Sequence, residues 1–214
     1  MDKEFQKRIL SSIIILPLTL FFIIEGSVLF TLFLISLFLI SSFEWLKMSK
    51  KNLLKIFGIF FLIFSFYSTF YLRDKDLQFF LLIVIICIST DLGGYIFGKL
   101  LKGPKLIKLS PNKTYSGMIG GFFLTVVNSY IFIKYFNFNS FYEKINLTDF
   151  TFILIVLVVS SVSQIGDLII SYFKRYSNIK NTGKILPGHG GLLDRIDGMI
   201  FVFPFVYLTI KHIL

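Results

Sequence analysis

Charged residues are scarce in this chain and make up only 16% of its 214 residues. A soluble globular domain carries about 25% charged and about 45–50% apolar residues, whereas this chain is 55% hydrophobic. One soluble core of this size cannot bury the whole apolar excess. Lipid is the other apolar environment, so the composition predicts an integral membrane protein.

Cysteine occurs once, at Cys87, which excludes an intramolecular disulfide. A lone cysteine in an apolar segment usually behaves as a small hydrophobic residue. The sequence also lacks a small-x-small cleavage site after its first apolar segment, where residues 21–24 are bulky. We therefore expect that segment, which follows Lys3, Lys7 and Arg8, to be an uncleaved span.

The hydrophobic residues are gathered into long segments. A helix needs about 20 apolar residues to cross a hydrocarbon core about 30 Å thick. Segments of this kind lie at residues 9–24, 27–46, 53–72, 77–97, 117–136, 150–172 and 196–213. The first is short for a span, and the connections leave little room for a soluble domain. We predict an all-α, polytopic membrane helical bundle of about seven transmembrane helices, with residues 1–214 forming a single domain.

The basic residues indicate the orientation. With a cytoplasmic N-terminus and seven crossings, 17 of the 22 lysines and arginines fall on the cytoplasmic side. Cytoplasmic loops carry an excess of these residues, so we expect a multi-pass protein of the cell (inner) membrane with its N-terminus in the cytoplasm. This distribution, together with anionic lipid head groups, accounts for the net charge of +10. We expect no nucleic-acid partner.

Four aspartates lie within or beside the apolar segments: Asp91, Asp167, Asp194 and Asp197. An ionisable side chain at membrane depth costs several kcal/mol and usually faces a polar cavity or a partner. In the seven-span arrangement all four lie near the cytoplasmic membrane face. We therefore expect one polar site at that boundary.

Helical spacing gives the segment at 150–172 a polar stripe. At about 100° per residue, the stripe covers an arc of about 100°. Its members are Ser160, Ser163, Gln164, Asp167, Ser171 and Lys174. Serine and glutamine in such a stripe often only join neighbouring helices. A buried carboxylate such as Asp167 also requires a cation.

The polar loops next to these segments supply hydroxyls, cations and glycines. In the loop at 98–116, Ser110, Lys113 and Thr114 precede a helix, an arrangement that suits an anion. In the loop at 173–195, glycines surround a histidine, and glycines let backbone amides approach phosphates. Aspartates together with phosphate oxygens are typical ligands of Mg²⁺. The combination indicates phosphoryl or nucleotidyl chemistry on a phosphorylated substrate.

Residues 171–197 closely resemble the signature of the phosphatidate cytidylyltransferases. That pattern reads S-x-x-K-R, four residues, K-D-x-G, and then L-P-x-H-G-G-x-x-D-R-x-D. The matching residues are Ser171, Lys174, Arg175, Lys180, Gly183, Leu186, Pro187, His189, Gly190, Gly191, Asp194, Arg195 and Asp197. Residues 164–167 resemble the Q-x-G-D stretch just upstream, so the signature region runs over 164–198. Residues 91–98, residues 110–121 and the stretch Phe43-Glu44-Trp45 also resemble parts of the family pattern.

The resemblance implies a helical membrane enzyme, usually a homodimer, that makes CDP-diacylglycerol and pyrophosphate from CTP and phosphatidate for phospholipid synthesis. It implies that Asp167, Asp194 and, in support, Asp197 hold Mg²⁺. These three and Lys174 are the expected catalytic residues. The expected substrate-binding residues are Ser110, Lys113, Thr114, Ser171, Arg175, Lys180, His189, Gly190, Gly191 and Arg195. His189 is more typical of a substrate contact than of a catalytic base.

The chain departs from the family pattern at Asn181, Ser116, Tyr115 and Ile170, where Asp, Glu, Trp and often Glu are expected. These departures leave a catalytically inactive relative as an alternative. Two others are a CTP-dependent cytidylyltransferase or kinase on another lipid phosphate or lipid alcohol, and an ion transporter. A transporter predicts midplane carboxylates in a repeated architecture. The D-G-x-x-A-R motif of the CDP-alcohol phosphotransferases is absent.

Overall fold

The computed structural model describes residues 15–107, 110–136, 148–183, 185 and 190–210. The long helices are α2 (Ser27–Met48), α3 (Asn52–Lys75), α4 (Leu77–Leu101), α5 (Tyr115–Tyr135) and α7 (Asp149–Tyr176). The shorter elements are strands β1 (Lys105–Ile107) and β2 (Ser110–Thr114) and helices α8 (Leu193–Ile196) and α9 (Met199–Ile210). The two strands pair as an antiparallel hairpin, which the sequence pattern did not predict.

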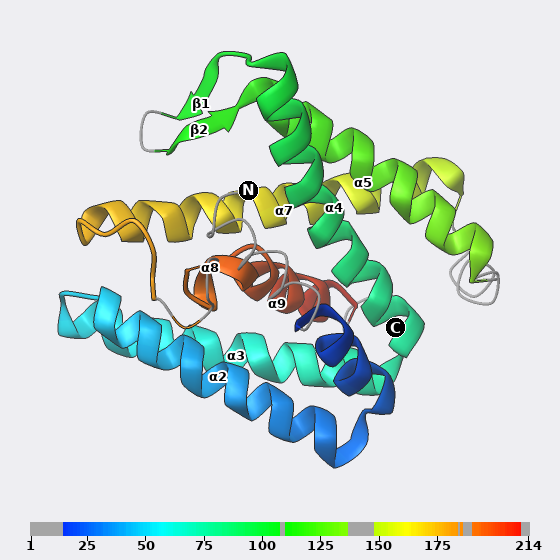
Figure 1. Cartoon of the computed structure of the whole chain (residues 1–214). Coiled ribbons are helices and arrows are strands. Elements are labelled where there is room, and N and C mark those ends of the chain that lie inside the picture. The colour runs from blue at the N-terminus through cyan, green and yellow to red at the C-terminus, as the bar shows by residue number, and fades with distance from the viewer. Residues whose placement is uncertain (1–14, 108–109, 137–147, 184, 186–189, 211–214) are drawn as a thin grey trace.

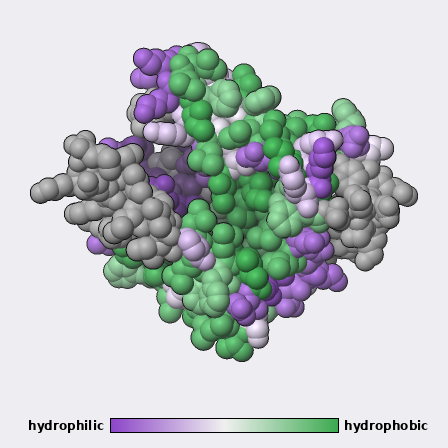
Figure 2. Space-filling view, turned by 45° about the vertical axis from the view of Figure 1, so that its right-hand side comes forward, coloured by the Kyte–Doolittle hydropathy of each residue, from purple (hydrophilic) through white to green (hydrophobic). Residues whose placement is uncertain are grey.

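The long helices α2, α3, α4, α5 and α7 are all long and apolar enough to cross a membrane. They match the five middle segments expected from the sequence. Within the described residues, the first and last segments form the shorter apolar helices Ile15–Glu25 and Met199–Thr209. Figure 2 shows hydrophobic atoms over the middle of the surface and hydrophilic atoms towards its margins. The prediction of an all-α, polytopic membrane protein is confirmed.

The helices are arranged in two groups around α9 (Figure 1). On one side α2 and α3 pack against each other, and on the other α4, α5 and α7 pack together. Helix α9 contacts α3, α4 and α7, so it joins the two groups. The contact is largely aromatic: Phe80 stacks on Phe203 with ring centroids 5.3 Å apart, and the Phe61 and Phe201 rings are 4.7 Å apart.

Side chains at the helix ends bind backbone groups that the helices leave unpaired. Asp76 accepts a hydrogen bond from the Phe79 N–H at 2.9 Å at the start of α4. Thr114 accepts one from the Gly117 N–H at 3.1 Å at the start of α5. Asp and Thr are favoured residues at this position. The Thr114 cap also fixes where the hairpin passes into α5, directly after Lys113.

Glycines let α4 and α5 approach each other closely. A Cβ on Gly93 would overlap the backbone of Gly120 and Gly121. A Cβ on Gly94 would lie 3.8 Å from the Gly117 carbonyl oxygen, which is an ordinary contact. Small residues at helix interfaces permit this approach in membranes. The packing sets the distance between the face of α4 that carries Asp91 and the start of α5.

Replacing Gly93 with alanine should destabilise the α4–α5 pair, because the added methyl group overlaps helix backbone. Overpacking of this kind typically costs about 1–3 kcal/mol. We expect a lower midpoint of thermal unfolding in detergent for Gly93→Ala, and a midpoint close to that of the wild type for Gly94→Ala. Equal midpoints for Gly93→Ala and the wild type would contradict this packing.

Candidate functional site

Polar side chains from α4, β2, α7 and the α8–α9 segment line one cavity of about 350 Å³. The charged and polar lining residues are Thr90, Asp91, Lys113, Thr114, Gln164, Asp167, Lys174, Asp194, Arg195 and Asp197. All four aspartates singled out from the sequence are among them. The expectation that they face one site is therefore confirmed in its geometry.

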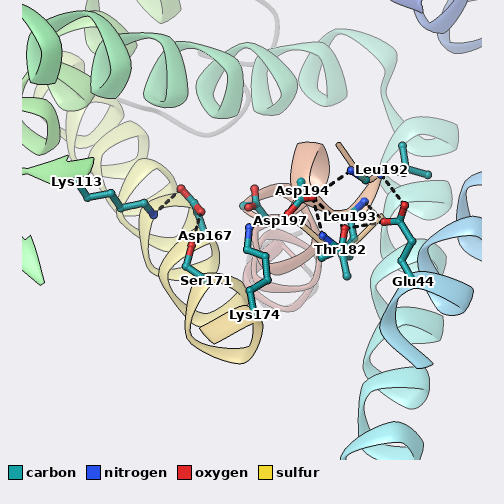
Figure 3. A network of polar contacts seen from close by, with 12 residues as sticks. Glu44, Lys113, Asp167, Ser171, Lys174, Thr182, Leu192, Leu193, Asp194 and Asp197 are labelled. Carbon is teal, nitrogen blue, oxygen red and sulfur yellow. Dashed lines mark hydrogen bonds and ion pairs between the residues drawn. The ribbon is translucent and has the colours of Figure 1, made fainter. Parts of the chain in front are cut away.

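Lys113 and Asp167 form an ion pair that joins the hairpin to α7 (Figure 3). Ser171, one helical turn after Asp167, donates a hydrogen bond to Asp167 Oδ1 at 3.3 Å. The side chains of Lys113 and Asp167 keep 25% and 28% of their surface exposed. The pair therefore remains accessible from the cavity.

Asp194 is bound through both of its carboxylate oxygens. Lys174 Nζ lies 2.7 Å from Oδ1, and the two side chains are only 13% and 10% exposed. Oδ2 accepts hydrogen bonds from the N–H groups of Thr182 and Gly191, at 2.9 and 3.1 Å. Hydrogen bonds to a charged acceptor are stronger than those between neutral groups. Asp194 is consequently held in one orientation at the cavity wall.

Asp197 lies between α8 and α9 and is 7% exposed. Its Oδ1 accepts the Gly198 N–H at 3.0 Å. A carboxyl group in these surroundings is stabilised by a bound proton or by an additional cation.

Hydroxyl groups beneath the cavity join α4, α5 and α7. Thr90 Oγ1 lies 3.0 Å from Thr125 Oγ1 and 2.7 Å from Ser160 Oγ. Gln164 Nε2 reaches the Met118 carbonyl oxygen at 3.5 Å. Ser160 thus joins helices, Gln164 both contacts α5 and lines the cavity, and Asp167 and Lys174 farther along α7 line the cavity. The polar stripe predicted from the sequence therefore both joins neighbouring helices and lines the cavity.

The structure places the expected substrate-binding residues differently, and Ser171 has already been described as a partner of Asp167. Lys113, Thr114 and Arg195 line the cavity, as the catalytic candidates do. Gly190 and Gly191 lie beside Asp194, and the φ of 93° at Gly190 is in the left-handed region that favours glycine.

The structure does not bring Arg175 and Lys180 to the cavity. Both are exposed and absent from its lining. Arg175 follows Lys174 on α7 and so points about 100° away around the helix. His189 lies outside the described residues. Ser110 lies in β2, but its side chain is not among those that the structure describes.

Two acidic residues have contacts at or beside the site but were not assigned a catalytic or binding role from the sequence. Asp91 lines the cavity from α4, and its signal was a carboxylate alone in an apolar segment. Glu44, in α2, accepts hydrogen bonds from the chain that leads into α8. The resemblance of Phe43-Glu44-Trp45 to the family pattern was its signal, but that resemblance did not indicate which groups Glu44 binds.

Comparison with known proteins places the chain in a family. Residues 53–213 match the sequence profile of the cytidylyltransferase family. The chain belongs to the cytidylyltransferase family. The match covers every residue named above in the cavity lining and leaves α2 outside. The family resemblance predicted from the signature region is confirmed.

Similar members of the cytidylyltransferase family come from staphylococci. Proteins named phosphatidate cytidylyltransferase are 37% identical over 146 residues in Staphylococcus haemolyticus (strain JCSC1435) and 35% identical over 142 residues in Staphylococcus saprophyticus subsp. saprophyticus. These alignments cover 68% and 66% of this chain, and 52% of each relative. The chain spans about half the length of the curated relatives it matches.

Replacing Lys174 with methionine should leave Asp194 without its cation and destabilise the protein. Loss of one partner of a largely buried pair costs about 1–3 kcal/mol or more. We expect Lys174→Met to lower the midpoint of thermal unfolding in detergent. The matched change at the exposed next residue, Arg175→Met, should shift the midpoint by less than half as much. Equal shifts would contradict the distinct surroundings of the two side chains.

Proposed function

We propose that the chain transfers the cytidylyl group of CTP to phosphatidate, giving CDP-diacylglycerol and pyrophosphate. The observation that carries the proposal is the meeting of Asp167, Asp194 and Asp197 with Lys113 and Lys174 in one cavity. Carboxylates and lysines in such an arrangement suit a metal–phosphate substrate. The name shared by the staphylococcal relatives supports the choice of substrates.

The proposed reaction exchanges one phosphorus–oxygen bond for another. A phosphate oxygen of phosphatidate bonds to the α-phosphorus of CTP, while the bond from that phosphorus to the α–β bridging oxygen breaks. Pyrophosphate leaves with the electron pair of the broken bond. Positioning and charge stabilisation are the main contributions of a protein to phosphoryl transfer. Lys113, Lys174 and Arg195 are the cavity cations in place to bind phosphate oxygens.

Asp167, Asp194 and Asp197 fit a Mg²⁺ ion by their donor chemistry, since Mg²⁺ binds one or two carboxylates together with substrate phosphates and water. Among the described residues, no group of three or more Asp, Glu, His or Cys side chains lies in an arrangement that could hold a metal ion by itself. We propose that these three aspartates hold Mg²⁺, which when bound neutralises triphosphate charge.

The cavity has an apolar border that suits a lipid substrate. Tyr95 and Leu168 line it beside the charged residues, and Tyr95 is 66% exposed on the surface of α4. Phosphatidate in the bilayer and CTP in solution would meet at such a boundary. The proposal therefore places the site at the cytoplasmic face of the cell membrane. It includes the homodimer that the family resemblance implies.

The purified full chain, with Mg²⁺, CTP and phosphatidate in mixed micelles, should form a lipid-soluble cytidine product and release pyrophosphate. Asp194→Asn should lower the rate by at least about 100-fold, because the charge facing Lys174 and the phosphates is lost. Asp149→Asn, an exposed carboxylate at the first turn of α7, is the matched control and should retain activity.

The substrates tested in parallel separate the proposal from its alternatives. Product with another lipid phosphate or with a lipid alcohol, and none with phosphatidate, would replace the substrate but keep the chemistry. An absence of product with every nucleotide and lipid tested would leave the inactive-relative and transporter interpretations.

Removal of divalent metal should abolish product formation reversibly. EDTA takes away the ion whose charge the aspartates need beside a triphosphate. Added Mg²⁺ should restore the rate, whereas Ca²⁺, which tolerates looser geometry, should restore much less. Full activity in EDTA would remove Mg²⁺ from the proposal without affecting the assignment of Asp194.

A further inference from the structure

Glu44 is a buried carboxylate outside the cavity lining. It lies in α2 and is 1% exposed. Its Oε1 accepts the Leu192 N–H at 3.0 Å, and its Oε2 accepts the Leu193 N–H at 2.8 Å and the Thr182 hydroxyl at 2.8 Å (Figure 3). All of these donors are neutral, and within the described part of the chain Glu44 forms no ion pair. Its charge strengthens hydrogen bonds to the chain that precedes Asp194.

Two stretches of chain close tightly around this carboxylate. A Cβ on Gly183 would overlap the Glu44 side chain, and a Cβ on Gly191 would overlap both Glu44 and the Thr182 hydroxyl. The glycines that resemble a phosphate-binding loop in the sequence therefore have a second use, which is to admit Glu44. Because both of its oxygens accept N–H groups, a glutamine would place its own NH₂ against a donor at one end.

Thr182 links Glu44 to Asp194. Its hydroxyl lies 2.8 Å from Glu44 Oε2 and 3.1 Å from Asp194 Oδ2, and its N–H donates to the same Asp194 oxygen at 2.9 Å. Figure 3 shows Thr182 between the two carboxylates. The chain at 182–183 and 191–193 is thus bound by Asp194 on the cavity side and by Glu44 on the side of α2.

Contacts of Trp45, the residue next to Glu44, hold this end of α2 in place. Trp45, next to Glu44, donates from Nε1 to the Leu54 carbonyl at 3.1 Å. Its ring meets that of Phe173 in α7 edge-on, with centroids 5.2 Å apart. Trp45 also belongs to the same buried apolar cluster as Leu193. The Glu44 carboxylate is therefore presented from a rigid support to the segment that it binds.

We infer that Glu44 is a positioning residue that holds Asp194 in the orientation needed at the cavity. Glu44 acts through Thr182 and through the backbone of Leu192 and Leu193. It lies outside residues 53–213, the part of the chain that matches the family profile. The effect on catalysis rests on the proposed function, whereas the effect on the local structure does not. Outer partners of metal-site ligands typically account for 10–100-fold in metal affinity or activity.

The first test needs no activity. Hydrogen exchange of the purified full chain in detergent should be followed for peptides covering 190–198 and, for comparison, peptides from α4 and α5. Glu44→Gln should speed exchange of the Leu192 and Leu193 amides by about 10-fold or more and leave the comparison peptides unchanged. Unchanged protection at 190–198 would overturn the inference. The matched control is Ser41→Ala in the same helix, whose buried hydroxyl has no hydrogen-bond partner among the described residues.

The second test separates positioning from folding. Glu44→Gln and Thr182→Val should lower kcat by about 10–100-fold, with the KM for CTP changed by less than about 3-fold. Thr182→Ser keeps the hydroxyl and should restore kcat to within about 3-fold of the wild type. Ser41→Ala should be as active as the wild type. Full kcat in both Glu44→Gln and Thr182→Val, or no rescue by serine, would overturn the inference.

The two tests also keep the proposals apart. A wild-type chain that forms no CDP-lipid contradicts the proposed function, yet the exchange measurement still decides whether Glu44 holds the segment at 191–193. An active wild type with faster exchange but unchanged kcat in Glu44→Gln overturns the positioning role and leaves the proposed function in place.

Discussion

A carboxylate buried among apolar helices must keep donors on its oxygens, because an unpaired buried charge costs several kcal/mol. Asp194 meets this requirement with Lys174 on one oxygen and the N–H groups of Thr182 and Gly191 on the other. These partners come from the end of α7 and from both sides of the glycine-rich segment. The carboxylate therefore holds together the parts of the chain from which this side of the cavity is built.

The two lysines at the site stabilise the aspartates of the cavity and can also reach a bound substrate. Lys113 and Lys174 each neutralise one aspartate, and each carries its charge on a flexible four-carbon stem. An arginine bound to a carboxylate through two parallel hydrogen bonds would be harder to displace. A lysine can turn from a carboxylate to a phosphate oxygen with little change in the backbone. The ion pairs that stabilise the cavity are thus made by the groups best suited to meet a charged substrate.

Local sequence patterns predicted those parts of the structure that depend on local physics. The apolar segments gave the long helices, and the polar stripe gave the face of α7 that carries Asp167 and Lys174. The position of the aspartates within or beside apolar segments correctly predicted that they face one polar cavity. The signature gave residues but not their directions: Arg175 belongs to the pattern yet points away from the cavity. A sequence motif identifies positions, whereas the direction of each side chain depends on its place around the helix.

The contacts of Glu44 show where this kind of inference stops. The residue lies 149 positions before Leu193, with which it forms a hydrogen bond. No periodicity or spacing rule connects two residues so far apart. A single acidic residue near the end of an apolar helix is usually interpreted as a charge at the membrane–water interface. Only the packing of α2 through Trp45 against α7 brings its carboxylate to the glycine-rich segment. Gly183 and Gly191 in that segment permit the close approach of Glu44. A side chain at Gly191 would overlap Glu44 and Thr182 before any substrate is bound, so the packing alone explains a glycine at this position of the signature.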